Sequence, residues 1–503
     1  MESQTIKPDE LLANPDYQPW LDPCLPYSYL WWAKVPIAEG IARWREIFGV
    51  TETVALGDGI AASVVIPVYN AAPYLPQMLI SLAAQTLRNF EIICVDDGST
   101  DGSLSVCKAF AEHDPRIKVV SQPNQGAAAA RNHGLEMAVG KWVLFVDADD
   151  FCRPEMLAEM AAEGEKGADV VVAGRHYLDF QGRHRGIEYD IPEPYLSLGG
   201  KLTSDTEGFD IFAGLGFAAW NKLYRREFLV AKGLKFLCLP ASNDITFVAC
   251  SLLRADGIRL LPKAYYYYRD GNPGSIVGRL DRHPTAFLEA WDAVWREVSD
   301  RSPRLQAQFY NAAVRTCFWQ LTHRRSVEGM LAVYHALLDG RLAALKGAGV
   351  DDGRLNLGLV RDAYDALMRR EPLESVLLAL FLSRRAKLDL ARQDLRKSKS
   401  EVAKLRDGAA ALKAEKAALK ESNALLKSKV QALKSKVQTL KAKVQTLKAS
   451  NARVKRQLAE TKESTSYKLG RLATAPFRKL RRLSRQPERL AERQPDDNFK
   501  VTK

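Results

Sequence analysis

Between residues 62 and 173 the chain alternates short apolar runs with longer segments of helical periodicity. The apolar runs, each short enough to be a buried strand, lie at 63–66, 90–95, 117–120, 141–146 and 168–173. The helical segments between the first four lie at 73–85, 101–112 and 125–139. Strands that alternate with helices at this spacing form parallel βαβ units. The pattern therefore predicts an α/β domain with a mostly parallel sheet between helices.

Polar residues gather where three of these predicted strands end. They are Pro67, Tyr69 and Asn70 after the first strand, Asp96 and Asp97 after the second, and Asp147 and Asp149 after the fourth. Carboxyl ends of parallel strands meet at one edge of the sheet, where open α/β sheets bind their ligands. Two carboxylates one residue apart can share a divalent cation that holds a diphosphate. The alternative is a solvated acidic turn, but three motifs on one edge favour a site.

The rest of the chain divides into an N-terminal extension and three C-terminal segments. We expect residues 1–60 to pack on the main domain, which spans 61–283. Residues 284–385 are predicted to be a helical annex, because apolar residues from Phe287 to Trp295 recur with helical spacing. A coiled coil is predicted at 386–462, and a basic amphipathic and disordered tail at 463–503.

The predicted coiled coil has valine at one core position of its heptads and leucine at the other. Examples are Val430, Val437 and Val444, each followed three residues later by leucine, which is typical of a parallel dimer. The flanking positions are lysines, so a twin helix would place like charges opposite each other. We predict a coiled-coil homodimer, with an acidic coiled-coil partner as the alternative.

Charge is unevenly distributed along the 503 residues. Residues 384–503 contain 34 Lys/Arg and 12 Asp/Glu, whereas residues 1–383 contain 39 and 48. A basic tail with interspersed apolar residues suits an anionic membrane surface. Its alternative is a solvated helix face. Nucleic acid is not an expected partner, because the lysine-rich coil lacks interleaved aromatic residues.

The compartment is predicted from cysteine usage and from the lack of an apolar segment that could serve as a secretory signal or span a membrane. Seven cysteines are scattered without a C-x-x-C pair, which is typical of a reducing compartment. The N-terminus shows no secretory signal, and no uncharged stretch reaches the roughly 18–20 residues that span a bilayer. We predict a cytoplasmic protein that is peripheral on the inner face of the plasma membrane.

Four motifs resemble those of the family 2 glycosyltransferases of GT-A fold, in the same order and spacing. They are VVIPVYN at 64–70, VDDGSTDGS at 95–103, NQGAAAARNHG at 124–134 and FVDADD at 145–150. The resemblance continues through WNKLYRREFL at 220–229 and covers about 63–280, less than half of the chain. It implies a GT-A fold and a nucleotide-sugar donor, with UDP as the expected nucleotide.

The resemblance assigns donor contacts to the polar cluster. Pro67 and Tyr69 would line the base pocket, Asp97 would accept a hydrogen bond from the base, and Asp96 would lie near the ribose, with Asn70 and Ala148 as further contacts. Arg131 would neutralise phosphate oxygens; its alternative is an ordinary surface arginine. Asp149 would bind Mn²⁺ or Mg²⁺, and Asp147 would contact sugar or ribose hydroxyls and that metal.

An inverting transfer also needs a base for the proton of the acceptor hydroxyl. Family members usually carry Glu-Asp before a helix here; this chain has Asn243 and Asp244, so Asp244 matches the base and Asn243 replaces the preceding acid. The alternative for Asp244 is a helix cap. Trp220 and Asn243 are the predicted acceptor contacts, and a buried core position is the alternative for Trp220.

We predict an inverting, metal-dependent, non-processive glycosyltransferase that acts on a lipid-linked or cell-surface glycan acceptor. The Gln-x-x-Arg-Trp motif and membrane helices of processive synthases are absent. A sugar nucleotidyltransferase is rejected, because PVYNAAP at 67–73 is not a Gly-rich phosphate loop. The remaining alternative is a coiled-coil scaffold with a weak or inactive transferase domain, which the substitution at Asn243 keeps open.

Overall fold

The computed structural model describes residues 32–178, 184–188, 191–270, 281–324, 326–347, 350–351, 355–387 and 423–463, with single residues between 389 and 398. These fall into two compact units. The first contains Met1–Thr316 with Asp339–Asn356, and the second contains Cys317–Leu338 with Leu357–Lys503. The candidate site lies entirely in the first unit.

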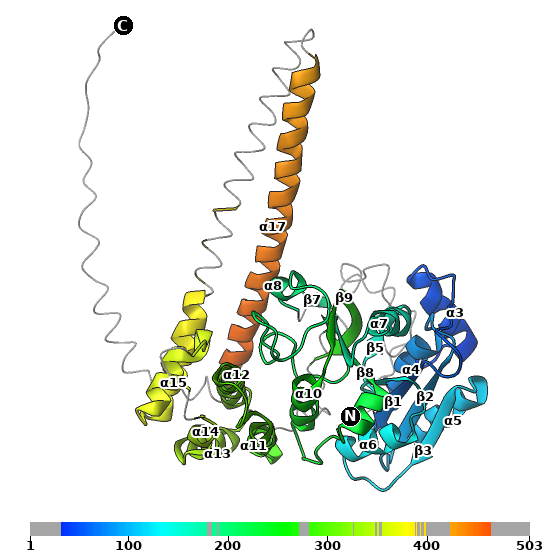
Figure 1. The fold of residues 1–503 in the computed structure, drawn as a ribbon, viewed down its shortest axis with the longest axis horizontal. Helices are drawn as coiled ribbons and strands as arrows, with labels where there is room; N and C mark the ends of the chain where they lie inside the picture. Colours follow the sequence, from blue (N-terminus) through cyan, green and yellow to red (C-terminus); the bar gives the residue numbers. More distant parts are fainter. Residues whose placement is uncertain are drawn as a thin grey trace, which may run out of the picture. The chain divides into compact units, whose positions relative to one another are not determined.

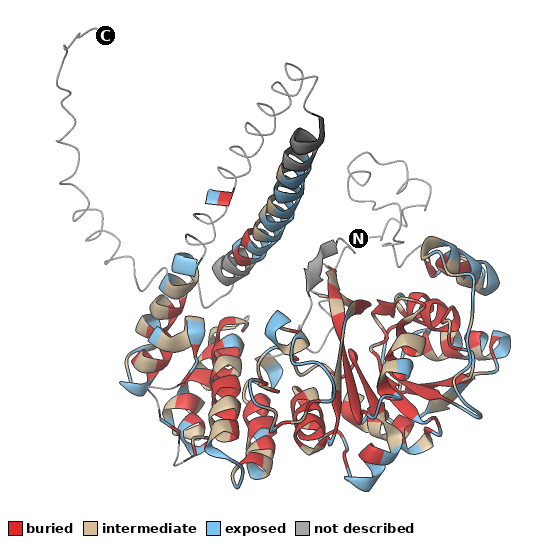
Figure 2. Cartoon of the chain, turned by 45° about the horizontal axis from the view of Figure 1, so that its top comes forward, coloured by how far each residue is buried: buried red, intermediate tan, exposed pale blue. Residues whose placement is uncertain are grey.

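A mixed sheet forms the centre of the first unit (Figure 1). Its strands are β1 (Ala62–Val68), β2 (Phe90–Asp96), β3 (Ile117–Ser121), β4 (Trp142–Phe145), β5 (Phe151–Cys152), β6 (Val170–Leu178), β7 (His184–Glu188), β8 (Lys222–Arg225) and β9 (Ile258–Arg269). Their order is β3-β2-β1-β4-β8-β6-β9-β5, with β7 beside β6. Every residue of β2 and β4 is buried, as expected for strands that are covered on both faces. Figure 2 shows most of the sheet in red, the colour of buried residues.

Strand direction changes across the sheet. β1 is parallel to β2 and to β4, and β2 is parallel to β3, which confirms the predicted βαβ units. β8 then enters antiparallel between β4 and β6, while β9 runs parallel to β6 and antiparallel to β5. The sequence pattern did not predict β8, because Lys-Leu-Tyr-Arg is not an apolar run.

The helices that connect the first strands agree with the predicted positions. They are α4 (Leu75–Ala83), α5 (Ser103–His113) and α6 (Ala127–Met137), followed by α7 (Met156–Gly164). α6 packs directly against β1 at Gly134, which has no side chain. A Cβ on Gly134 would stand 2.3 Å from Cγ1 of Val65. This glycine therefore sets the distance between α6, which carries Arg131, and the sheet.

Replacing Gly134 with alanine is expected to destabilise the first unit. The new methyl group would overpack a full core position, which typically costs about 1–3 kcal/mol of unfolding free energy. Denaturant or thermal unfolding measures the change. Gly102→Ala is the matched control, because its Cβ would meet only the Cβ of Ala72 at 3.8 Å. Equal stability of the two variants would contradict the close packing of α6 on β1.

The described N-terminal residues pack on the sheet unit. Trp32 and Trp44 are 1% and 0% exposed. Trp44 lies in α3 (Ile37–Ile47), its ring meets Phe151 edge-on, and its Nε1 donates a hydrogen bond to the carbonyl of Cys152 at 3.2 Å. This segment therefore belongs to the core of the first unit. Residues 1–31 lie outside the described part of the chain.

Helices α8 (Glu193–Leu196), α9 (Arg226–Ala231) and α10 (Asn243–Arg254) lie between the later strands. Helices also occupy much of the described part of 284–387: α11 (Ala286–Val298), α12 (Pro303–Thr322), α13 (Val327–Leu338), α14 (Arg341–Ala344), the short 3₁₀ helix η4 (Gly358–Val360) and α15 (Arg361–Met368). α11 belongs to the sheet unit, because Trp291 is buried against Phe217 and Phe309. The division between the units falls within α12, well after the predicted boundary at residue 284.

From residue 423 onward, the described part of the heptad region is one helix, α17 (Asn423–Glu463), 41 residues long. Lys434, Lys436, Lys441 and Lys443 on it are exposed. The predicted pairing of this coil stays a prediction. The predicted tail from 464 onward and residues 401–422 lie outside the described residues. Among the helices that the structure describes, none has the length and apolar character to cross a membrane.

Candidate active site

The register of the sheet places the predicted motifs at the adjacent ends of neighbouring strands. Val68 pairs with Asp96 across β1 and β2, and Val65 pairs with Phe145 across β1 and β4. The residues that follow these pairs leave the sheet at one edge. The structure therefore places the turns that follow Val68, Asp96 and Phe145 at one edge of the sheet, as the parallel arrangement predicted. Pro67, which was predicted to follow the first strand, lies within β1.

Two aspartates at the end of β2 hold the neighbouring loops. Asp97 is 2% exposed and accepts hydrogen bonds from Gln122 Nε2 at 2.9 Å and from the backbone N–H groups of Gln125 and Gly126 at 2.9 and 2.8 Å. Asp96 accepts from Ser121 Oγ at 2.8 Å. Asp97 thus fixes the segment that leads into α6, a role that the sequence motif did not reveal.

The turn after β1 presents one exposed aromatic ring. Tyr69 is 45% exposed, whereas Pro67 is half-buried. Asn70 has a positive φ of 50°, and its Oδ1 accepts a hydrogen bond from the backbone N–H of Thr100 at 2.8 Å. Its own N–H donates to Ser99 Oγ at 3.1 Å. Asn70 therefore fastens the first turn to the second and leaves the ring of Tyr69 accessible.

The acidic turn after β4 is organised by β9. The backbone N–H of Arg269 donates to Oδ1 of Asp150 at 2.7 Å, and its Nε donates to the carbonyl of Asp149 at 2.9 Å. The hydroxyl of Tyr266 accepts from the N–H of Asp147 at 2.9 Å. Hydrophobic periodicity does not predict this pairing, because Asp150 and Arg269 are 119 residues apart in the chain.

Burial raises the pKa of Asp150 well above its ordinary value, and the charges of Asp149 and Asp147 raise it further. Asp150 is 1% exposed, whereas the side chain of Asp147 is 27% exposed. The turn therefore combines a buried carboxyl that holds the backbone with two partly exposed carboxylates, those of Asp147 and Asp149. Asp150 is the structural member of the three.

Arg131 lies at the centre of the site and contacts two carboxylates. Its Nη2 donates to Oδ1 of Asp147 at 2.7 Å, and its Nη1 donates to Oδ1 of Asp244 at 3.0 Å and to Oδ1 of Asn243 at 3.1 Å. Its side chain is only 6% exposed, so it is not a surface arginine. Burial alone would lower the pKa of Arg131, but Asp244 and Asp147 raise it above its usual value.

Asp244 stands in the first turn of α10. Ser242, immediately before the helix, adopts a left-handed conformation with φ 61° and ψ 25°. Ser242 occupies the N-cap position and makes no side-chain hydrogen bond to the helix, and Asp244 is the second residue of α10. Burial raises the pKa of Asp244, although the positive charge of Arg131 offsets part of that effect. A raised pKa makes a carboxylate a stronger proton acceptor.

The two predicted acceptor contacts are both buried. Trp220 is 5% exposed, and its ring stacks on Tyr266 and Tyr268 with centroid distances of 4.5 and 5.3 Å. Stacking an acceptor sugar needs an exposed ring face, so the packing interpretation describes Trp220 better. Asn243 is 5% exposed and binds Arg131. Ala148, a predicted donor contact, is 6% exposed.

The donor atoms at the acidic turn suit a hard divalent cation. Mg²⁺ and Mn²⁺ prefer oxygen ligands, and Mg²⁺ typically takes only one or two protein carboxylates together with waters and substrate phosphates. Asp147 and Asp149 are the two partly exposed carboxylates of this turn. Among the described residues, no group of three or more His, Cys, Asp or Glu side chains is arranged to hold a metal alone. The arrangement thus fits an ion shared with a diphosphate.

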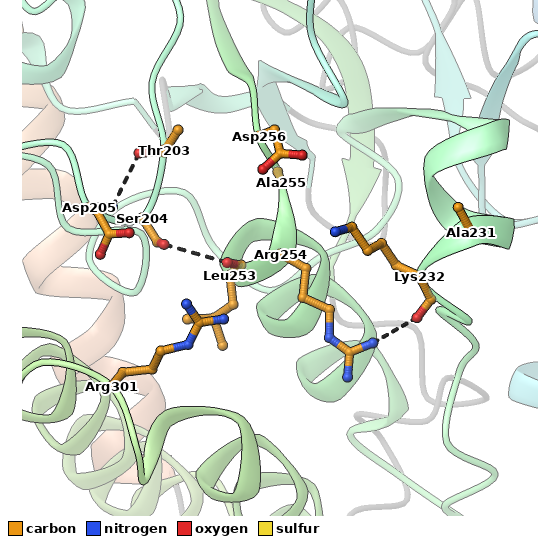
Figure 3. A pocket seen from close by; sticks show the side chains of 10 residues that line it. All are labelled: Thr203, Ser204, Asp205, Ala231, Lys232, Leu253, Arg254, Ala255, Asp256 and Arg301. Atoms are coloured by element: carbon orange, nitrogen blue, oxygen red, sulfur yellow. Dashed lines mark hydrogen bonds between the residues drawn. The ribbon is translucent and has the colours of Figure 1, made fainter.

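A cavity of about 510 Å³ lies away from this cluster (Figure 3). Its walls include Lys232, Arg254, Asp256 and Arg301. Arg254 ends α10, ten residues after Asp244, which corresponds to about 15 Å along the helix axis. Arg254 is also paired with Glu297. The cavity is therefore separate from the candidate active site.

The fold is of the GT-A type: a mixed sheet between helices with a polar cluster at the carboxyl ends of its parallel strands. The structure of Staphylococcus aureus TarS residues 1–349 in complex with UDP-GlcNAc is similar, with a TM-score of 0.50 and 23% sequence identity, over 65% of this chain and 92% of that one. At this identity the likeness concerns the fold.

Sequence comparison then defines the family. The family model described as "Glycosyl transferase family 2" matches residues 63–229 of this chain. The uncharacterized glycosyltransferase YibD of Escherichia coli (strain K12) is 35% identical over 275 residues, which cover 51% of this chain and 78% of YibD. The putative glycosyltransferase EpsH of Bacillus subtilis (strain 168) is 34% identical over 229 residues, 44% of this chain and 64% of EpsH. The chain belongs to glycosyl transferase family 2, which confirms the predicted family and class of enzyme.

Proposed function

We propose that the chain is an inverting, non-processive glycosyltransferase that moves one sugar from a nucleotide-sugar donor, with UDP as the expected nucleotide. The observation that carries this proposal is the convergence of three strand ends with the first turn of α10. It places Asp244 and Asp147 on the same buried guanidinium, at 3.0 and 2.7 Å. A base and a donor-side carboxylate at this spacing suit transfer between two substrates bound side by side.

Two groups of residues would have separate roles, one in binding the donor nucleotide and the other in activating the acceptor hydroxyl. The exposed ring of Tyr69 would stack on the base of the nucleotide, with Pro67 and the end of β2 beside it. Asp244 would accept the proton of the acceptor hydroxyl while that oxygen attacks the anomeric carbon. The nucleoside diphosphate leaves from the opposite face of the sugar, so a single displacement inverts the anomeric configuration. One base suffices for this step.

Asp149 and Asp147 would hold Mn²⁺ or Mg²⁺ together with the diphosphate. The ion would supply positive charge that stabilises the negative charge developing on the departing diphosphate. Arg269 and Tyr266 support this role, because their hydrogen bonds fix the backbone of the turn in place.

We expect the acceptor to be a lipid-linked or cell-surface glycan on the cytoplasmic side. Support comes from the segment directly before α10. Leu237, Cys238 and Pro240 on it are exposed, with Leu237 at 40%. Phe236 anchors the segment, because its N–H and carbonyl bind the side-chain amide of Asn132 at 2.8 and 2.9 Å. This apolar surface has a fixed backbone and lies close in sequence to the general base, Asp244. Such a surface suits an acceptor that has an apolar portion.

A thermal-shift screen of nucleotide sugars, with and without Mn²⁺, tests this proposal. A ligand at one hundred times its Kd stabilises the folded chain by about 2.7 kcal/mol, which is easily detected as a rise in Tm. We expect one nucleotide class to stand out and to need Mn²⁺ for its full effect. Free sugars are the control. If no nucleotide shifts Tm, the second candidate, a coiled-coil scaffold with an inactive domain, which Asn243 favours, replaces the proposal.

As pH decreases, the activity is expected to be lost at a higher pH than the ordinary pKa of an aspartate would give. Asp244 must be ionised to accept a proton, and burial raises its pKa above its ordinary value. The rate therefore falls as pH decreases through that raised pKa. A profile of kcat/KM between about pH 4 and pH 8 measures this acid limb. An acid limb at the ordinary aspartate pKa, about 3.9, would contradict the role of burial.

A further inference from the structure

We propose that Arg131 is a positioning residue that couples the donor side of the site to the acceptor base, and that Asn243 is the substitution that makes this coupling possible. The set of Arg131, Asp147, Asn243 and Asp244 is called the Arg131 network. The proposal rests on the proposed function for its catalytic meaning. It differs from the sequence expectation, in which Arg131 was a ligand of the phosphates.

The contacts of the guanidinium carry the first step. Both terminal nitrogens of Arg131 are used inside the protein, one by Asp147 and the other by Asp244 and Asn243, at 2.7 to 3.1 Å. Its Nε is buried without a hydrogen-bond partner among the described residues. A guanidinium is planar and rigid, so binding one carboxylate fixes the place of the other. Arg131 therefore joins the end of β4 to the start of α10.

The packing around Arg131 holds it in that place. The ring of Phe236 lies 5.3 Å from its guanidinium carbon. Phe236 in turn stacks on Phe247 of α10, with ring centroids 3.9 Å apart. Arg131 itself extends from α6, whose close approach to β1 depends on Gly134. Elements on both sides of the site thus fix the guanidinium, and reaching a phosphate would require it to leave two ion pairs.

Charge explains why residue 243 is an amide. The family resemblance implies an acid at this position, where the chain has Asn243. A third carboxylate here would be 5% exposed and would compete with Asp244 for the same nitrogen of Arg131. Its negative charge would also lie beside Asp244 and oppose the ionisation of both. The amide of Asn243 accepts the hydrogen bond without adding charge, so Arg131 stays shared between Asp147 and Asp244.

A ligand-free mutant cycle tests the coupling without any substrate. Tm is measured for Asp147→Asn, Asp244→Asn and the double variant, in the wild-type chain and again with Arg131→Met. We expect the two Tm shifts to be non-additive in the wild-type chain, because both carboxylates share one cation. With Arg131→Met, only the direct repulsion between Asp147 and Asp244 remains, so the deviation from additivity is expected to change. Additive shifts in the wild-type chain would overturn the proposal. This outcome is independent of whether the chain transfers sugar.

Kinetics separate positioning from phosphate binding. Release of UDP is followed with the UDP-sugar that gives the largest shift in the screen, for Arg131→Lys and Asn243→Asp. A positioning role predicts that kcat falls by about tenfold or more in both variants, while KM for the donor changes by less than about threefold. A rise in KM at unchanged kcat would make Arg131 a phosphate ligand and overturn the proposal.

Arg116→Lys is the matched control for these measurements. Arg116 is also paired with an aspartate, Asp114 at 2.6 Å, and also lies over an aromatic ring, that of Phe90 at 4.4 Å, but it is remote from the site. The control is expected to retain the kcat of the wild-type chain. If the wild-type chain releases no UDP from any donor, the proposed function fails, whereas the mutant cycle still decides whether the Arg131 network couples its two carboxylates.

Discussion

Asp244→Asn is expected to stop sugar transfer while the nucleotide still binds. Asparagine keeps the shape of the side chain but cannot accept the proton of the acceptor hydroxyl, and removing a general base typically costs about 10²–10⁴ in rate. Because burial raises the pKa of Asp244, its ionised form is costly, and neutralising it is not expected to unfold the chain. Initial rates together with nucleotide-induced Tm shifts measure the two effects separately.

The control for this variant is Asp256→Asn, which changes an exposed aspartate just beyond the other end of α10. It should transfer sugar at the wild-type rate. Retained turnover in Asp244→Asn would assign the base to another residue. A lost Tm shift would mean instead that Asp244 contributes to donor binding, and the division between donor and acceptor sides would need to be redrawn.

Asp149→Ala is expected to abolish the dependence on Mn²⁺ or Mg²⁺ and most of the transfer activity with it. The carboxylate would no longer help to hold the cation against the diphosphate, and loss of such charge stabilisation typically lowers kcat by about 10²–10³. A metal titration of activity measures the effect, and it should show no saturable activation in the variant. Asp150 is unsuitable for this test, because it is buried and holds the backbone of Arg269.

Asp205→Asn serves as the control for Asp149→Ala, because Asp205 is an exposed aspartate on the wall of the separate cavity. It should keep both the metal dependence and the rate. Full activity of Asp149→Ala at saturating metal would remove Asp149 from the metal site. Loss of activity together with a large fall in Tm would show that the turn had unfolded, and Asp149→Asn would then separate charge from structure.

Local patterns predicted the first half of the sheet well. Strands β1 to β4 and the helices between them form contiguous βαβ units. The hydrophobic periodicity of the sequence therefore locates the bounds of these elements within a few residues. β8 and β9 are different, because their places in the sheet depend on pairing with strands far away in the sequence. β8 has only two apolar residues, Leu223 and Tyr224, and it lies in the middle of the sheet only because β4 and β6 flank it.

Local sequence patterns predicted the candidate site only in part as well. Spacing identified which residues gather at the sheet edge, but it did not predict their partners. Arg131 and Asp244 are 113 residues apart, and their contact depends on the packing of α6 and α10 against the same sheet. Asp97 likewise holds the loop before α6 through contacts up to 29 residues away. Motifs predict the residue types, whereas side-chain direction follows from tertiary packing.

The dependence of the acidic turn on β9 has a consequence for how the chain is made. A ribosome adds about 5–20 residues per second, so the 119 residues between Asp150 and Arg269 take roughly 6–24 s to synthesise. During that interval β1 to β4 can already associate, while the turn that follows them still lacks the backbone amide that will hold it. The nascent enzyme therefore acquires the first four strands of its sheet before its catalytic competence, and a chain that stops before residue 258 is expected to be compact but inert.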